Sequence, residues 1–165
     1  MRNIIFVFLD GIGIGKKDSN FNPFFKYGFK TLGHLFGVIP DLENQFISNG
    51  DKHIFPTDAV LGVEGLPQSG TGQTSIYCGI NAQELIGKHF GPFPFSTLHP
   101  IIEKENIFKY LEQHNNKTMF ANAFPSIFFD YLKEGKRRLS VTSLSCILSN
   151  IPLCGYDELK NGDAL

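Results

Sequence analysis

Residues 4–15 read IIFVFLDGIGIG, and this stretch decides the fold that we expect. Its first six residues are all apolar, mostly β-branched or aromatic, and they do not alternate with polar residues. A strand buried on both faces has this pattern, and such strands belong to parallel sheets covered by helices. The sequence therefore predicts an α/β fold with a largely parallel sheet covered by helices.

Composition limits the kinds of protein this chain can be. With 165 residues, 42% of them hydrophobic and 19% charged, it is expected to form a single domain over 1–165. The formal net charge is -1 and the basic residues are mostly scattered, so we expect no nucleic acid partner. The run at 4–9 is much shorter than the roughly 20 residues of a membrane span, so we expect no membrane partner and a cytoplasmic location.

The three cysteines are odd in number and lack the close paired spacing of a zinc knuckle. We therefore expect Cys78, Cys146 and Cys154 to be buried free thiols.

Local patterns predict the remaining elements of secondary structure. Residues 29–36 form a short amphipathic pattern, and the polar, turn-rich region 38–58 leaves room for one or two short strands. Further along, the patterns predict one short strand within 117–124 and helices over 73–86, 101–113, 126–133 and 139–148, with a last helix starting in 156–165.

The glycines after the first run do not form a nucleotide-binding loop. Gly11, Gly13 and Gly15 are spaced two apart, and Lys-Lys-Asp follows them instead of a helix or the Lys-Ser/Thr of a P-loop. Asp10 is the better candidate, because ligands gather beyond the carboxyl ends of strands in open α/β sheets. Two interpretations of Asp10 are open at this point: it binds a cation, or it caps the strand end through loop N–H groups.

A second informative stretch, GLPQSGTGQTSIYCGINA, covers residues 65–82. Ser69 stands just before the predicted helix, where an exposed alcohol on a sharp bend faces backbone N–H groups that favour a phosphate. The alternative is that Ser69, Thr71 or Thr74 is only the N-cap of this helix.

Together the two stretches resemble the alkaline phosphatase superfamily, especially its cofactor-independent phosphoglycerate mutases and phosphopentomutases. Residues 4–15 are similar to the strand that carries the first metal-binding aspartate of that family, which corresponds to Asp10. SGTGQ, residues 69–73, is similar to the mutases' Ser-x-x-Gly-His segment, in which the first residue is the nucleophile; Ser69 takes that position. Thr74 is an alternative nucleophile in an alignment that slides by five residues. The run 65–94 also resembles an uncharacterised metalloenzyme group of the superfamily.

This resemblance implies an alkaline-phosphatase-like core and a site with two divalent metal ions, zinc or manganese. Asp10 and Ser69 would be metal ligands, and Ser69 would be the nucleophile that forms a phosphoserine intermediate. Gly70, Gln73 and His89 would contact the substrate, a phosphate-ester small molecule. The implied function is that of a metal-dependent phosphatase or phosphomutase.

The sequence departs from the family in its remaining metal ligands. The family supplies them from an Asp-x-x-x-His motif, an Asp-His pair and a further lone His, and no histidine of this chain has an Asp directly before it or four residues earlier. We therefore expect the chain to correspond to the N-terminal half of such an enzyme, with an incomplete core and possible self-association through an exposed sheet edge. For His89 we expect substrate contact or loop packing rather than metal binding. The alternative function is that of a noncatalytic remnant or binding module of the same fold.

Two more stretches have an ordinary and a functional interpretation. GKRRLS, residues 135–140, is either a solvated turn or a contact for an anionic substrate. The aromatic residues of 93–95, next to Pro92 and Pro94, are either core residues or the lining of a cleft.

Overall fold

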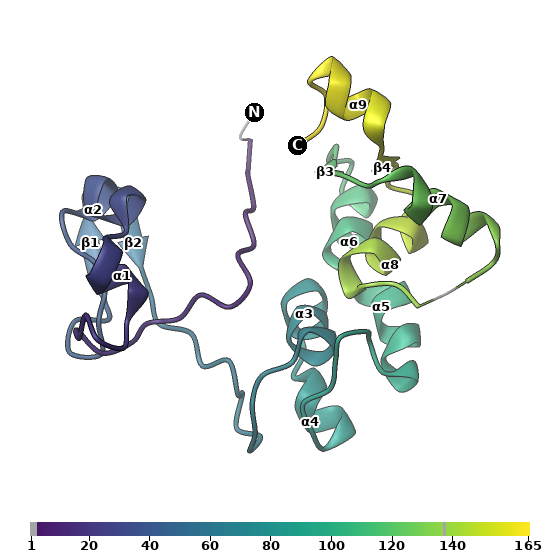
Figure 1. Ribbon diagram of the computed structural model, residues 1–165. Coiled ribbons are helices and arrows are strands. Elements are labelled where there is room, and N and C mark those ends of the chain that lie inside the picture. Colours follow the sequence, from purple (N-terminus) through teal and green to yellow (C-terminus); the bar gives the residue numbers. More distant parts are fainter. Residues whose placement is uncertain (1–2, 137) are drawn as a thin grey trace. The chain divides into compact units, whose positions relative to one another are not determined.

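The computed structural model describes residues 3–136 and 138–165 and is a mixed α/β structure with many short helices and a few short strands (Figure 1). It divides into two compact units, residues 1–58 (unit 1) and 59–165 (unit 2), which are described separately here. The α/β class is thus confirmed. The larger parallel sheet and the single domain over 1–165 stay predictions. None of the helices described is long and apolar enough to cross a membrane.

The first apolar run does not form the strand that its sequence predicts. Residues 4–9 of unit 1 are extended without strand pairing, and their side chains are exposed, from 41% at Phe8 to 89% at Ile4. A strand needs a neighbour whose N–H and C=O groups face its own. Among the described residues of unit 1, the strands β1 (Ile47–Asn49) and β2 (Lys52–Ile54) pair with each other as an antiparallel hairpin.

Unit 1 also contains two short helices with clear end signals. Asn22 caps α1 (Pro23–Tyr27) by accepting a hydrogen bond from the Phe24 N–H, which sequence reasoning missed. The amphipathic pattern at 29–36 is confirmed as α2 (Lys30–Phe36), which ends at Gly37 in the left-handed conformation. The Asn49 side-chain amide donates to the Leu35 carbonyl (3.1 Å) and ties the hairpin to α2.

Unit 2 is built from helices packed around one small core. The core residues Tyr77, Ala82, Leu98, Ile102 and Val141 come from different helices and are at most 7% exposed. These helices are α3 (Ser69–Cys78), α4 (Ala82–Ile86), the 3₁₀ helix η1 (Ser96–Leu98), α5 (His99–Glu105) and α8 (Val141–Leu148). Outside this core lie α6 (Ile107–Gln113), α7 (Ser126–Lys133) and α9 (Tyr156–Asn161).

Several predicted helices are confirmed with changed boundaries. The helix predicted over 126–133 has those limits, and the one predicted over 139–148 begins two residues later. The helix predicted over 73–86 begins earlier, at Ser69, and is interrupted at Gly79. Gly79 adopts φ +68°, a left-handed conformation that ends a helix and that glycine adopts without a Cβ penalty.

The helix predicted over 101–113 is two helices because Asn106 interrupts it. The Asn106 side-chain oxygen accepts hydrogen bonds from the N–H groups of Phe108 and Lys109 and thereby caps α6. It also accepts from the Ser149 hydroxyl (2.9 Å), and the side-chain amide donates to the Ile102 carbonyl (2.7 Å). Asn106 is fully buried, so this one side chain satisfies four polar groups in the interior of unit 2.

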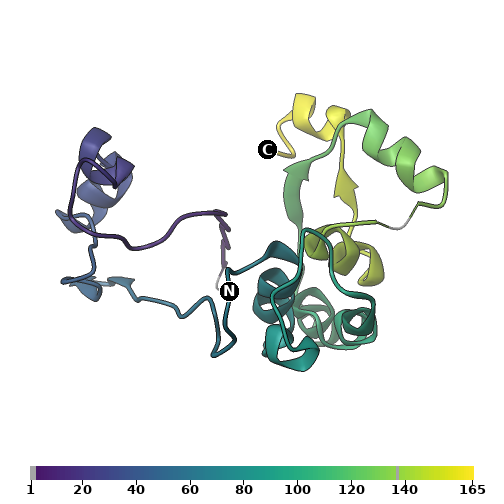
Figure 2. The same ribbon diagram turned by 60° about the horizontal axis from the view of Figure 1, so that its bottom comes forward.

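The strand predicted within 117–124 is confirmed as β3 (Phe120–Ala123), which pairs in parallel with β4 (Leu153–Cys154). Figure 2 shows the two arrows side by side, with α7 connected to the end of β3. The backbone of Leu165 also bonds to β3, donating to the Ala121 carbonyl and accepting from the Ala123 N–H.

The cysteines are free thiols, as predicted, and Cys146 and Cys154 are buried. Burial raises the pKa of the Cys146 thiol to about 12 and that of the half-buried Cys78 to about 11. Both thiols are therefore neutral at physiological pH.

Replacing the buried asparagine tests the helix interruption. Asn106→Ala removes the α6 cap and leaves the Ser149 hydroxyl and the Ile102 carbonyl buried without their partner. We expect the free energy of unfolding to fall by about 2–4 kcal/mol. Urea denaturation followed by helical circular dichroism measures it. The matched control is Asn116→Ala, at an exposed asparagine, which should change stability by less than about 0.5 kcal/mol. Equal effects of the two substitutions would contradict the role given to Asn106.

Candidate functional site

Asp10 belongs to unit 1 and lies in a turn directly after the extended residues 4–9. Gly11, which follows it, has φ +70°, a left-handed conformation that favours glycine. Asp10 is exposed. The turn therefore presents a carboxylate at the surface of unit 1, and the pairing of Asp10 with Ser69, a residue of unit 2, stays a prediction.

Ser69 is the first residue of α3 and is partly exposed. Sequence reasoning put it just before a helix that begins at residue 73, so the helix start is corrected by four residues. The N-cap is Gln68, whose side chain makes no capping hydrogen bond. The interpretation of Ser69, Thr71 or Thr74 as the N-cap is therefore wrong.

The other hydroxyls of α3 are used within the fold. Thr74 is fully buried and its hydroxyl donates to the Gly70 carbonyl (2.7 Å). Thr71 is also fully buried, and its hydroxyl donates a hydrogen bond to the Gln68 carbonyl (3.3 Å). The Ser75 hydroxyl donates to the side-chain oxygen of Gln83. The Thr74 hydroxyl is therefore buried, whereas Ser69 is partly exposed, and the assignment of either residue as nucleophile stays a prediction.

Gly70 lets the loop 90–93 approach the start of α3 at backbone distance. The Thr71 N–H donates to the Phe90 carbonyl (2.9 Å), and the Phe90 N–H donates back to the Thr71 hydroxyl (3.2 Å). A Cβ on Gly70 would lie 2.6 Å from the Phe90 carbonyl oxygen and closer still to the Phe93 carbonyl oxygen. No side chain fits there. The predicted substrate-binding glycine thus has a packing role that its sequence motif does not indicate.

Gly91 completes this contact from the side of the loop. A Cβ on Gly91 would lie 3.1 Å from the backbone nitrogen of Ser69 and 3.3 Å from that of Gly70. The loop therefore lies directly over the first residues of α3, beside the candidate nucleophile.

Gln73 connects α3 with α8. Its side-chain oxygen lies 3.5 Å from the Thr142 hydroxyl, which also donates to the Tyr77 hydroxyl at 3.2 Å. Burial raises the pKa of Tyr77, so this phenol stays protonated at neutral pH. Gln73 therefore has a structural contact with α8, and its contact with a substrate stays a prediction.

His89 holds the segment that leads into α3. Its Nε2 lies 3.0 Å from the Val63 carbonyl oxygen, and because a carbonyl only accepts, Nε2 carries the proton. In the neutral ring Nδ1 is then an acceptor, and it is buried without a hydrogen-bond partner in the part of the chain that the structure describes. The contact with Val63 supports the loop-packing role considered for His89, and its predicted contact with substrate stays a prediction.

The residues present do not by themselves fit a catalytic dication site. Asp10 and Ser69 offer two oxygen ligands, whereas catalytic zinc sites commonly have three protein ligands. Within residues 3–136 and 138–165, no group of three His, Cys, Asp or Glu side chains is placed to hold a metal ion. A complete two-metal site would need further ligands.

Sequence reasoning found part of a cavity next to this site. Phe93, Pro94 and Phe95 line it, which confirms the cleft interpretation of the segment 93–95. His99 and Arg138 line it as well. His99 was missed as a candidate because nothing in its neighbourhood in the sequence marks it. Arg138 belongs to the segment 135–140, which the sequence predicts to be either a solvated turn or a contact for an anionic substrate.

Comparisons of the chain with known protein families, with curated proteins and with solved structures found no match.

Adding one methyl group at Gly70 tests the backbone contact between α3 and the loop. Gly70→Ala forces the Phe90 and Phe93 carbonyls away from the helix, and we expect a loss of about 2–3 kcal/mol in the free energy of unfolding, measured by urea denaturation. The control is Gly72→Ala two residues later in the same helix, where a Cβ would meet no atom within 4 Å. Because alanine favours helix over glycine, this control should be neutral or stabilising by up to about 1 kcal/mol. A harmless Gly70→Ala would refute the contact.

Proposed function

We propose that this chain carries the nucleophile segment of a metal-dependent phosphoryl-transfer enzyme, a phosphatase or a phosphomutase. Ser69 is the proposed nucleophile and Asp10 a proposed metal ligand. The observation that supports this best is the position of Ser69, a partly exposed alcohol at the first residue of α3. Thr71 and Thr74 of the same helix are fully buried, so a substrate reaches Ser69 more readily than either of them.

The electrostatics of the helix start favour this chemistry. Backbone dipoles place partial positive charge at the N-terminus of a helix, and α3 has ten residues to contribute. A phosphoryl group next to Ser69 would lie in that field. The neutral buried contacts of Thr71 with the loop 90–93 would hold the helix start in place while negative charge develops.

In the proposed reaction the Ser69 oxygen forms a bond to phosphorus while the bond from phosphorus to the ester oxygen breaks. The Ser69 hydroxyl releases its proton to water, and the leaving oxygen takes up a proton from water and departs as an alcohol. Water then hydrolyses the phosphoserine in a phosphatase, or a second hydroxyl of the substrate accepts the phosphoryl group in a mutase. A bound dication would lower the pKa of the Ser69 hydroxyl, so that the serine could act as a nucleophile at neutral pH. The proposal includes a parallel sheet larger than the β3–β4 pair, as in an alkaline-phosphatase-like core.

The second candidate is a noncatalytic binding module of the same fold. It is favoured by the ligand count, since the described residues contain no group of three side chains placed to hold a metal. In that case the start of α3 would be a structural feature only.

The nucleophile is tested by trapping the phosphorylated protein. A form of the protein that also supplies the missing metal ligands is incubated with p-nitrophenyl phosphate and Mn²⁺ or Zn²⁺, and mass spectrometry should then find phosphoserine at Ser69. Ser69→Ala should lower phosphate release at least about a hundredfold while the circular dichroism spectrum is retained. The matched control is Thr97→Ala, which removes an exposed hydroxyl of η1. Its rate of phosphate release should stay within about twofold of that of the unmodified chain. Full activity of Ser69→Ala would remove the proposal.

Metal titration separates the two candidate functions. Because Asp10 and Ser69 alone do not complete a dication site, the phosphoryl-transfer proposal predicts saturable binding of Mn²⁺ or Zn²⁺ in a form of the protein that also supplies the missing ligands. Calorimetry measures this binding, and Asp10→Asn should weaken it at least about tenfold because a charged ligand is lost. A folded form of that kind that takes up neither ion, and releases no phosphate, is the result expected for a binding module.

A further inference from the structure

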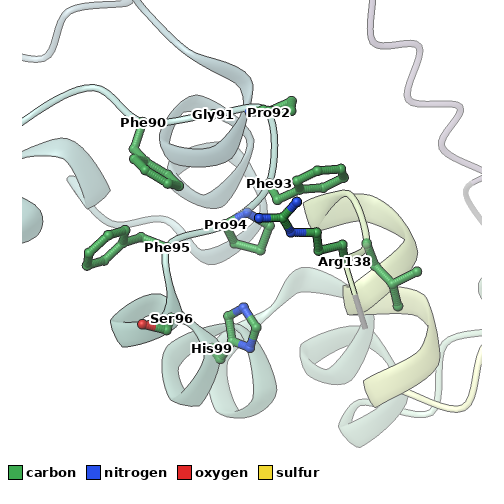
Figure 3. Close-up of a pocket in the computed structure, with 10 residues that line it drawn as sticks. Phe90, Gly91, Pro92, Phe93, Pro94, Phe95, Ser96, His99 and Arg138 are labelled. Atoms are coloured by element: carbon green, nitrogen blue, oxygen red, sulfur yellow. The ribbon is translucent and has the colours of Figure 1, made fainter. Parts of the chain in front are cut away.

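Unit 2 contains a cavity of about 370 Å³ beside the start of α8. The loop 90–96 forms one wall, and His99 of α5 together with Arg138 and Leu139 forms another (Figure 3). Three of the lining side chains are phenylalanines, Phe90, Phe93 and Phe95, and two are prolines. This volume is at the small end of ligand pockets and matches one ring with a small substituent.

The polar side chains that line the cavity, those of Ser96, His99 and Arg138, can all donate a hydrogen bond. Arg138 contributes a guanidinium, and Figure 3 shows its side chain extending toward Phe93 and Pro94. His99 contributes an imidazole, and the lining contains no carboxylate. Lys88 is not a lining residue, but its Nζ lies 5.7 Å from the centre of the Phe90 ring and 5.5 Å from that of Phe95, two rings that line the cavity. The cavity therefore combines flat apolar walls with positive charge.

Arg138 differs from the other cations of its segment. Lys133 pairs with Asp130 at 3.2 Å, and Lys136 pairs with Glu134 at 2.6 Å, so both have a carboxylate partner. The Arg138 side chain forms no ion pair with any residue in the described ranges. A planar guanidinium without a carboxylate partner is suited to bind a carboxylate or phosphate of a ligand through two parallel hydrogen bonds.

The backbone of Arg138 is held in place by α7. The Tyr131 hydroxyl accepts a hydrogen bond from the Arg138 N–H (3.2 Å) and donates one to the Arg138 carbonyl (3.4 Å). The next residue, Leu139, is only 3% exposed. The backbone from which the side chain extends is thus held by the Tyr131 hydroxyl and by the burial of Leu139.

We propose that this cavity binds a small organic anion with a planar ring. The ring lies against the phenylalanine and proline side chains of the loop 92–95, and the anionic group accepts hydrogen bonds from Arg138 and His99. Gly91 belongs both to this cavity and to the contact over Ser69, so the bound ring and its anionic group would be a part of the phosphate ester other than the phosphoryl group that Ser69 attacks; that identification rests on the proposed function, but the binding itself does not.

Phenyl phosphate is the probe, since it joins one ring to one anionic group. It is titrated into the full chain in metal-free buffer with EDTA, and amide and side-chain shifts are followed by NMR. We expect saturable shifts at Gly91, His99 and Arg138, and weaker binding of inorganic phosphate and of phenol. Equal affinity for inorganic phosphate, or shifts confined to other residues, would overturn the proposal.

Two substitutions separate charge from ring contact. Arg138→Gln should raise the Kd of phenyl phosphate about tenfold and leave the weak binding of phenol unchanged. The matched control Lys133→Gln removes a cation of the same segment that lies outside the cavity, and the Kd should stay within twofold. An Arg138→Gln variant that keeps its dispersed NMR spectrum and its affinity would refute the role of the guanidinium. Ser69→Ala should bind phenyl phosphate normally, so a failure of the pocket and a failure of the nucleophile give different results.

Discussion

The constraint on which unit 2 depends is the backbone contact between the start of α3 and the loop 90–93. Gly70 has no side chain, and the Phe90 and Phe93 carbonyls occupy the place where a Cβ would be. The reciprocal hydrogen bonds between Thr71 and Phe90 then fix the first turn of the helix against the loop. Buried backbone groups need partners, and here each satisfies the other across 19 residues of sequence.

This contact relates the candidate nucleophile to the cavity. On one side of it Ser69 begins the helix, partly exposed, at the positive end of the helix dipole. On the other side the same loop provides the aromatic and proline wall that faces Arg138 and His99. A change that displaces the loop is therefore expected to alter both features together, whereas Ser69 and Arg138 can be changed one at a time.

The fold was predictable where local signals are sufficient. The limits of α7 follow from its apolar periodicity. The turn-rich region 38–58 indicated room for one or two short strands, but neither their position nor their pairing as a hairpin was predicted. Two helices were predicted too long because a glycine conformation at Gly79 and a buried side-chain network at Asn106 interrupt them. Residues 4–9 carry a strand-like sequence but have no strand paired with them, since pairing depends on a neighbour and not on the segment itself.

For the site, the sequence indicated Ser69 through the small residues around it, and the cleft through the prolines beside the phenylalanines. It could not indicate that Gly70 is needed for packing, because the carbonyls that exclude a side chain come from a distant loop. That His99 and Arg138 line the same cavity was equally invisible, since they are distant in sequence and α5 packs against α8, which begins three residues after Arg138.

Hydrogen exchange of the Thr71 amide tests the central contact most directly. An N–H at the third position of an isolated helix has no partner within the helix and exchanges readily. Since this one donates to the Phe90 carbonyl at 2.9 Å, we predict protection as strong as that of amides in the middle of α3. Exchange of the Thr71 amide at the rate of an unstructured peptide, with the middle of α3 still protected, would contradict the account.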